Sequence, residues 1–319
     1  MNLDNSKHSI GEAYSKLILV GEHAVVYGKP AIAIPFPLKA RATVKQFKGP
    51  IIFKTSFYKG YIYEVPTQMK GIVECIKETL LVLNQPFKDL EITIDSYIPI
   101  GRGLGSSAAI AIAIIRSLFS FYGHNLSQDE LFYLVEIAEN YAHGNPSGLD
   151  MIASSSKHPI WFKREKESIP INLNKPFYIV VADTGKEGNT RKAVENVKNE
   201  YELDKRNIQK SLDKIERIVI NSKKALINGD VDLLGECLNL NQKELINLGV
   251  SDNNINELID VAINCGALGA KLTGGGLGGC IIVLARDLDQ ARFISDKLVE
   301  SGAENSWYFS TNTDRLYIP

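Results

Sequence analysis

The sequence lacks an excess of charge of either sign. Lysine and arginine total 36, aspartate and glutamate total 37, and the net charge of the 319-residue chain is therefore −1. Without surplus cations, the chain has no general electrostatic attraction for a nucleic-acid backbone or an anionic bilayer. We therefore expect no nucleic-acid or membrane partner, and any anionic ligand must be bound by a local site.

Cysteine and long apolar runs are also scarce. The 4 cysteines stand far apart without a Cys-x-x-Cys pair, which argues against a disulfide framework or a zinc site and favours a reducing cytoplasm. The first 16 residues are mostly polar, and the longest wholly apolar run, residues 108–115, is far shorter than the ~20 residues that span a bilayer. We expect neither a signal peptide nor a membrane span.

Length and composition are typical of a globular protein with about two domains. At roughly 150 residues per domain the chain is long enough for two, and 45% hydrophobic with 23% charged residues disfavours disorder. Helix and strand patterns mix in both halves, which predicts an α+β architecture. The lysine- and glutamate-rich segment 157–175 is similar to a linker, so we expect an N-terminal domain over residues 1–174 and a C-terminal domain over 175–319.

Hydrophobic periodicity predicts the individual elements. Short apolar or alternating stretches indicate strands at 17–20, 31–34, 42–44, 90–94, 178–182, 271–273 and 280–284. Helical spacing indicates helices over 108–121 and 128–143 and around 208–219. Ser127 and Glu130 have the spacing of a capping box, and Asp230 and Asp252 are typical caps of two further helices.

The densest glycine signal of the first half is a loop between a strand and an apolar helix. Its residues include Pro99, Gly101, Gly103, Leu104, Gly105, Ser106 and Ser107. The loop lacks the ending of a Walker A motif, and a serine stands where the dinucleotide fingerprint needs its third glycine. A tight glycine turn at a helix N-terminus directs N–H groups and the positive helix dipole at one point, which favours a phosphate. The simpler alternative is that one of the two serines merely caps the helix.

A second glycine tract spans residues 274–279. Gly274, Gly276 and Gly279 match Gly-x-Gly-x-x-Gly formally, but the tract precedes a strand instead of opening a helix, so no dinucleotide site is expected. A hairpin turn explains some of these glycines but does not need all 5 of them. We therefore interpret the tract as a place where the backbone closely approaches a ligand.

Several single residues could complete a site for phosphoryl transfer. Glu139 borders an apolar stripe near a helix C-terminus, where the dipole disfavours negative charge, so this carboxylate needs a cation. Lys16 precedes a buried strand, and Asp150 follows a turn. Each of these residues, like His23, has a simpler interpretation as a solvated, turn-forming or structural side chain. Together with a phosphate loop they form the minimum set for phosphoryl transfer, in which catalysis is mostly positioning and charge neutralisation.

Three segments resemble the GHMP kinases, in the same order along the chain. They are residues 16–30 (KLILVGEHAVVYGKP), residues 99–109, which match Pro-x-x-x-Gly-Leu-Gly-Ser-Ser-Ala-Ala, and the tract 273–279. The resemblance implies a two-domain GHMP kinase fold with ATP and an alcohol substrate in the cleft between the domains. Within this family, residues 21–23 and 145–150 are similar to the mevalonate kinases. Those enzymes use ATP and Mg²⁺ to phosphorylate the primary hydroxyl of mevalonate, giving 5-phosphomevalonate on the route to isoprenoids.

The resemblance also implies roles for individual residues. Asp150 would orient the substrate hydroxyl, and Lys16 would hold that hydroxyl and Asp150 together. Ser107 and Glu139 would hold Mg²⁺, while the loop from Gly103 to Ser107 would surround the ATP phosphates. The residues expected to face the substrate are Glu22, His23, Thr190 and Gly276.

At one position the sequence departs from the animal members of this family. Gly188 stands where they carry an arginine, two residues before the threonine. Arg191 and Lys186 are the two candidates to replace that arginine at the substrate carboxylate, and the sequence does not decide between them.

Two other functions stay open at this point. A phosphomevalonate kinase, or another GHMP small-molecule kinase, shares the fold, but phosphomevalonate needs extra cations that His23 and Gly188 do not obviously supply. A non-catalytic ligand sensor on the same fold would have no need of Lys16, Glu139 and Asp150 together. The family also makes a homodimer the expected assembly.

Overall fold

The computed structural model describes residues 7–143, 147–164, 166 and 168–319. The chain forms two compact units whose segments alternate along the sequence. The first unit contains the chain up to Ser15, Leu38–Ile98 and Gly105–Lys157, and the second contains Lys16–Pro37, Pro99–Leu104 and His158–Pro319. Both units mix helices and strands, which confirms the α+β class. The domain division expected after residue 174 stays a prediction.

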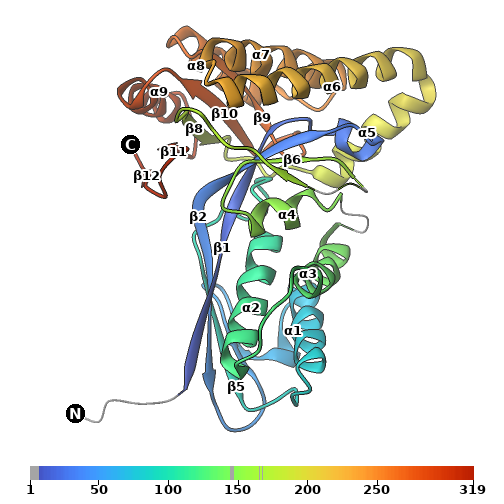
Figure 1. Ribbon diagram of the computed structural model, residues 1–319, viewed down its shortest axis with the longest axis vertical. Helices are drawn as coiled ribbons and strands as arrows, with labels where there is room; N and C mark the ends of the chain where they lie inside the picture. The colour runs from blue at the N-terminus through green and yellow to red at the C-terminus, as the bar shows by residue number, and fades with distance from the viewer. Residues whose placement is uncertain (1–6, 144–146, 165, 167) are drawn as a thin grey trace. The chain divides into compact units, whose positions relative to one another are not determined.

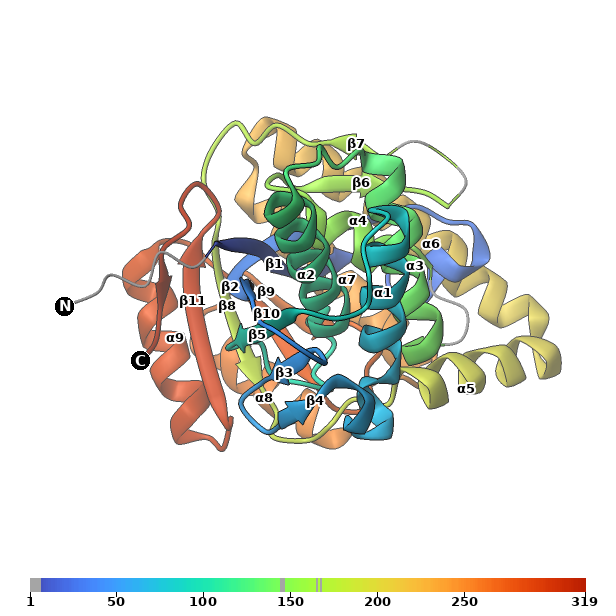
Figure 2. The same cartoon turned by 90° about the horizontal axis from the view of Figure 1, so that it is seen from below.

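In the first unit, helices α1, α2 and α3 lie side by side (Figures 1 and 2). The short helix α4 packs against α2 and α3, and the strands form a sheet in the order β4-β3-β5-β2. The bounds are β1 His8–Val20, β2 Ala31–Gln46, β3 Ile52–Lys54, β4 Lys59–Tyr61, β5 Leu90–Ser96, α1 Lys70–Val82, α2 Ser106–Tyr122, α3 Gln128–His143 and α4 Leu149–Ser155. Along the chain, β1 begins in the first unit and ends in the second, whereas β2 begins in the second unit and ends in the first.

Helix α2 is the buried centre of the helix packing in the first unit. Ala108, Ile112 and Ile115 are 0% exposed, because nearly every side chain of the helix is apolar and protein surrounds it. The helix begins after Gly105, whose φ is +73°, and no side chain caps its N-terminus. The alternative that a serine caps α2 is therefore wrong, and the first N–H groups of the helix have no side-chain acceptor of that kind.

The predicted capping box of α3 is confirmed. The Ser127 backbone N–H donates to Glu130 Oε2 at 2.9 Å, and the Glu130 backbone N–H donates to Ser127 Oγ at 3.2 Å. The two reciprocal bonds satisfy N–H groups that the helix itself leaves without partners. They fix the start of the helix that carries Glu139.

Strand β2 differs from the expectation of two separate strands at 31–34 and 42–44. It is one strand, in which Ala31–Ala33 pair with β6 and Ala40–Gln46 pair with β5. Pro35 and Pro37 lie between the two paired stretches, outside the residues that face β5 or β6. The prolines lack an N–H donor but interrupt neither ladder there, so the strand continues through them.

In the second unit, a sheet in the order β12-β11-β8-β10-β9 is packed by α7, α8 and α9 (Figure 1). The bounds are β6 Ile160–Phe162, β7 Ile169–Pro170, β8 Tyr178–Asp183, β9 Gly269–Thr273, β10 Cys280–Ala285, β11 Asn305–Ser310, β12 Leu316–Tyr317, α5 Thr190–Leu203, α6 Lys205–Asn228, α7 Val231–Asn247, α8 Asn253–Asn264 and α9 Leu288–Glu300. Short 3-10 helices are η1 Ala24–Tyr27, η2 Ile62–Glu64 and η3 Thr67–Met69. Strands β9 and β10 pair antiparallel, so the second glycine tract is the connection of a hairpin.

The caps predicted in the second unit are also confirmed. Asp230 accepts from the Leu233 N–H at 3.0 Å, and Asp252 accepts from the Ile255 N–H at 3.1 Å. The segment 157–175, read from sequence as linker-like, contains β6 and β7, where Ile160 is 2% exposed.

The cysteines carry no disulfide. Cys75, Cys237 and Cys280 are buried, and Cys265, at the end of α8, is half-buried. Burial raises the pKa of the Cys75 thiol to about 12. In the part of the chain that is described, every helix is too short or too polar to cross a bilayer.

Candidate active site

Lys16 and the first glycine loop meet within the second unit. The Lys16 side chain is 1% exposed, and its Nζ donates to the Gly103 carbonyl at 3.0 Å. The Lys16 backbone N–H donates to the Leu104 carbonyl at 3.1 Å. These two bonds place the ammonium of the expected catalytic lysine directly at the glycine loop.

The second glycine tract packs against that loop. A Cβ atom at Gly103 would lie 3.2 Å from the Thr273 carbonyl oxygen, and one at Gly274 would lie 3.0 Å from Gly103 Cα. Both glycines have positive φ, +76° and +85°. Glycine is required here because the two backbones touch and side chains rarely adopt such φ values.

The tract also contacts Thr190 at the start of α5. A Cβ atom at Gly275 would lie 2.4 Å from Thr190 Oγ1, and one at Gly276 would lie 2.1 Å from the Val250 carbonyl oxygen. The structure therefore brings Thr190 and Gly276, both expected to face the substrate, to the same hairpin connection.

Glu22 forms a buried ion pair that the sequence analysis missed. Its Oε1 accepts from Lys271 Nζ, which also donates to the Leu272 carbonyl, and both side chains of the pair are 0% exposed. Glu22 Oε2 has no hydrogen-bond partner among the described residues. Burial raises the pKa of Glu22 and lowers the pKa of Lys271, and the charge of each partner opposes the effect on the other. The available signal was a lysine in the otherwise apolar stretch 269–272 before the glycine tract.

His23 holds the second glycine tract. Its Nε2 donates to the Gly275 carbonyl at 2.9 Å, and the side chain is 6% exposed. The φ of His23 is +59°, a conformation rare for a residue with a side chain. Burial lowers the pKa of His23 to about 4, so the imidazole is neutral at physiological pH. The ring thus acts as a neutral donor to the backbone.

The predicted Mg²⁺ ligands, the two loop serines and Asp150 belong to the first unit, whereas residues 99–104 of the loop, including Pro99 and Gly101, belong to the second. Ser106 and Ser107 form the first turn of α2 and are half-buried. Glu139 lies on α3, which packs against α2, and is 3% exposed. Asp150 is half-buried in the first turn of α4. Asn145 and Pro146, part of the segment that suggested this aspartate, lie outside the described residues.

The two candidates for the missing arginine differ in their contacts. Lys186 Nζ donates to Asp252 Oδ2 at 2.9 Å, in a pair whose lysine side chain is 54% exposed. Arg191 lies exposed in the first turn of α5, next to Thr190. Lys186 is therefore engaged with a carboxylate of its own unit.

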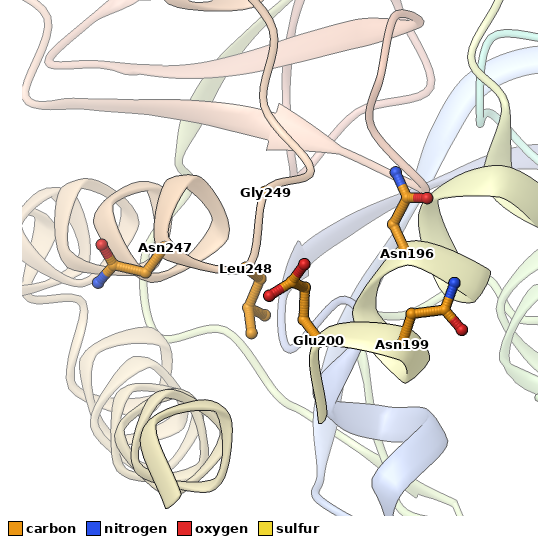
Figure 3. A pocket seen from close by; sticks show the side chains of 6 residues that line it. All are labelled: Asn196, Asn199, Glu200, Asn247, Leu248 and Gly249. Atoms are coloured by element: carbon orange, nitrogen blue, oxygen red, sulfur yellow. The ribbon is translucent and has the colours of Figure 1, made fainter. Parts of the chain in front are cut away.

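One hollow of the second unit lies apart from all of these residues. Figure 3 shows its lining, which comes from α5 and from the end of α7 with the residues after it. The lining residues are Asn196, Asn199, Glu200, Asn247, Leu248 and Gly249. None of the residues predicted from sequence belongs to this set.

Comparison with known proteins identifies relatives over most of the chain. The GHMP kinases N terminal domain matches residues 68–158, and the GHMP kinases C terminal domain matches residues 222–304. A mevalonate kinase of Pyrococcus horikoshii is 33% identical over 301 residues, which cover 88% of this chain and 89% of the relative. A mevalonate kinase of Aeropyrum pernix is 31% identical over 304 residues, covering 92% and 93%.

Solved structures show the same similarity. The crystal structure of L. major mevalonate kinase in complex with R-mevalonate has a TM-score of 0.84 at 27% identity and covers 97% of each chain. A phosphomevalonate kinase of Streptococcus pneumoniae, at a TM-score of 0.79 and 18% identity over 94% of this chain and 99% of that one, shares the fold.

Proposed function

Because the chain belongs to the mevalonate kinase family of GHMP kinases, we propose that it transfers the γ-phosphoryl group of ATP to the primary hydroxyl of mevalonate. The observation that carries the proposal is the contact of the Lys16 ammonium with the Gly103 carbonyl in the glycine loop. A buried lysine at such a loop supplies the fixed positive charge that phosphoryl transfer needs.

The phosphates of ATP bind at the N-terminus of α2. The first N–H groups of this helix are not capped by any side chain, and Gly105 allows the backbone to approach a ligand closely. The helix dipole adds positive potential at the same point. Ser106 and Ser107 add two hydroxyl donors beside those N–H groups.

Asp150 and Lys16 act on the transferred group. In a loose transition state little proton transfer has occurred, so Asp150 serves chiefly to orient the attacking hydroxyl. Lys16 stabilises the charge on the phosphoryl oxygens. The substrate side of the site is formed by Thr190, Gly276, Glu22 and His23. Glu22 acts indirectly, through its ion pair with Lys271, and His23 acts through its hydrogen bond to the glycine tract.

The donor set of the first unit fits Mg²⁺. This ion keeps several waters and is usually held by one or two protein oxygens together with substrate phosphates. Glu139, a carboxylate 3% exposed on α3, and the Ser107 hydroxyl on the adjacent α2 are donors of that kind. Among the described residues, no three His, Cys, Asp or Glu side chains are grouped so that they could hold a metal ion. When bound, Mg²⁺ would neutralise charge on the phosphates.

A substrate panel tests the proposed function. ADP release is measured with mevalonate, phosphomevalonate, galactose and homoserine in turn, against a reaction without acceptor. We expect turnover with mevalonate alone. Turnover with phosphomevalonate instead would assign the chain to the other mevalonate-route kinase, and ATP binding with no turnover for any acceptor would favour the sensor. The homodimer expected from the family and the cytoplasmic location expected from the scarcity of cysteine stay predictions.

A further inference from the structure

Arg102 stands in the first glycine loop, and the proposed chemistry does not use it. Its Nε donates to Asp183 Oδ2 at 2.8 Å, and its Nη2 donates to Glu304 Oε2 at 3.0 Å and to the Gly185 carbonyl at 3.2 Å. The Arg102 side chain is 12% exposed and that of Asp183 is 1% exposed. An arginine in a glycine loop is thus directed into the protein and bound to three acceptors.

We propose that Arg102 is a positioning residue that fixes residues 99–104 of the phosphate loop, and through Gly103 the ammonium of Lys16, by its ion pair with Asp183. Arg102 does not touch a reacting atom in this role. The inference rests on the proposed function in one respect, namely that Lys16 acts in phosphoryl transfer.

The anchor of this contact is rigid. Asp183 is the last residue of β8, the central strand of the sheet, and is paired on both sides, with Cys280 of β10 and Asn305 of β11. Its Oδ1 accepts from the Gly185 N–H at 3.0 Å, which fixes the carboxylate that Arg102 contacts. The Glu304 N–H donates to the Asp183 carbonyl at 2.9 Å, which ties down the backbone that carries the second carboxylate.

The loop needs such an anchor because the residues on either side of Arg102 are glycines, which have no side chain to hold them. Arg102 lies between Gly101 and Gly103, whose φ values are +72° and +76°. Glycine loses more conformational freedom on folding than any other residue, so a glycine turn held only by its backbone is poorly fixed. One further bond, from the Gly188 N–H to the Gly101 carbonyl at 2.8 Å, holds the same turn.

The position of the loop determines the position of the Lys16 ammonium, because the two are joined by a hydrogen bond. Gly103 is the next residue after Arg102, and its carbonyl accepts the Lys16 Nζ hydrogen bond at 3.0 Å. The Leu104 carbonyl then accepts from the Lys16 backbone N–H. If the ion pair of Arg102 is lost, the Gly103 carbonyl is therefore no longer held where it accepts the hydrogen bond that orients the Lys16 ammonium.

Steady-state kinetics of graded variants test the inference. We expect Arg102→Ala to lower kcat by about 10- to 100-fold, because misplacing a catalytic group by about 1 Å costs rates of that order. Arg102→Lys keeps the positive charge but not the planar guanidinium group, so its kcat should lie between that of the parent and that of the alanine variant. Glu304 is the second carboxylate partner of Arg102 and its side chain is 54% exposed. The kcat of Glu304→Gln should therefore stay within about twofold of that of the parent. Arg292→Ala, on the exposed face of α9, is the matched control.

A double-mutant cycle with Asp183→Asn separates positioning from general damage. Arg102→Ala and Asp183→Asn should be strongly non-additive in kcat, because each removes the same contact. A folded Arg102→Ala variant with parent kcat, or losses that simply add, would overturn the inference. If thermal melts show that Arg102→Ala does not fold, Arg102→Lys decides alone: parent-like kcat would overturn the inference, and a severalfold loss at unchanged melting temperature would support it.

Failure of the proposed function would look different. A parent that does not phosphorylate mevalonate contradicts the substrate assignment, and the Arg102 series is then measured with whichever alcohol the parent accepts. Calorimetric titration with MgATP in the absence of any acceptor gives a second readout. There we expect Arg102→Ala to weaken nucleotide binding severalfold, while Arg292→Ala leaves it unchanged.

Discussion

Single polar or charged residues of the second unit are fixed by a small number of strong contacts. Lys16 donates to Gly103, Lys271 pairs with Glu22, and His23 donates to Gly275. Each contact links a polar side chain to glycine-rich backbone or to another charge, in surroundings where an unpaired group would be costly. The side chains that make these contacts are all buried.

The role of Asp150 is tested by Asp150→Asn. The amide keeps the size of the side chain but cannot orient the hydroxyl as the carboxylate does. We expect kcat to fall by about 100-fold or more, with the affinity for ATP changed little, as measured by steady-state kinetics and nucleotide titration. Unchanged turnover would remove Asp150 from the mechanism.

The role of Glu139 is tested by a metal titration. Glu139→Gln removes a carboxylate oxygen that we assign to Mg²⁺, and loss of one such ligand should raise the Mg²⁺ concentration for half-maximal activity roughly 10-fold. Activity is measured over a Mg²⁺ series at saturating ATP. Curves that overlay those of the parent would contradict the assignment, and Glu136→Gln, at an exposed position one turn earlier on α3, is the control.

The neutral state of His23 predicts a pH dependence of stability. Burial lowers its pKa in the folded chain to about 4, whereas the unfolded chain has the ordinary value of 6.5. The unfolded state therefore binds the extra proton first as pH falls, so the contribution of this residue is present above pH 6.5 and is lost toward pH 4. Between pH 7.5 and pH 5 the loss is about 2 kcal/mol. Urea denaturation of the parent should show it, and His23→Gln, which cannot titrate, should lack that part of the pH dependence.

Residue types and local spacing made part of the candidate site predictable. Lys16, the glycines and the capping residues were found because motif and spacing are local. The pairing of Glu22 with Lys271 was not found, because the two residues are 249 positions apart and only the fold brings them together.

Among the elements, the β9–β10 hairpin has the most demanding geometry. Its connection contains four glycines with positive φ, namely Gly274, Gly276, Gly278 and Gly279, and Leu277 at φ +53°. Neighbouring backbone occupies the space that side chains would need at most of these positions. The connection is therefore shaped by its contacts as well as by the turn.

Two alanine substitutions separate backbone conformation from close approach. Gly123→Ala, at φ +74° with no atom within 4 Å of the added Cβ, should cost only the conformational penalty of about 1 kcal/mol. Gly276→Ala, at φ +79° with the Val250 carbonyl oxygen 2.1 Å away, should cost at least about 3 kcal/mol. Chemical denaturation measures both. If both variants lost the same free energy of unfolding, the backbone near Val250 would have moved away from the added Cβ atom without an energetic cost.

Elements with strong local signals were predictable, and one with mixed signals was not. The bounds of α3 agree with the expected helix over 128–143, because a capping box marks its start and its apolar stripe is regular. The apolar stretches 31–34 and 42–44 predicted two strands, whereas β2 is one strand that includes Pro35 and Pro37. Only the pairing of the finished sheet shows that neither proline has to donate to β5 or β6.

For the whole molecule, ligand binding should be visible in thermal stability. A ligand present at 100 times its Kd stabilises the folded state by about 2.7 kcal/mol, which corresponds to roughly 5 °C in Tm for a chain of this size. We expect MgATP to raise Tm by that order without any acceptor, and we expect Asp150→Asn to keep the shift. A melting curve unmoved by MgATP would contradict ATP binding, whatever alcohol the enzyme accepts.

Helical and strand patterns in both halves of the sequence predicted the α+β class. They did not predict that each of the two units is assembled from several separate segments of the chain. Segments such as 16–37 and 99–104 join residues after 158 in one unit, and no local signal announces that assignment. Long-range pairing decides it, and periodicity within a window of one helix or strand carries no information about partners that distant.

The distribution of the four thiols has a practical consequence. With Cys75, Cys237 and Cys280 buried and Cys265 alone half-buried, a maleimide dye should attach to the native protein at a single position, at the end of α8. No cysteine would have to be engineered in or out for fluorescence work. When the chain unfolds, all four cysteines become accessible and the number of dye molecules per chain should rise toward four. The extent of labelling would therefore measure the fraction of unfolded protein.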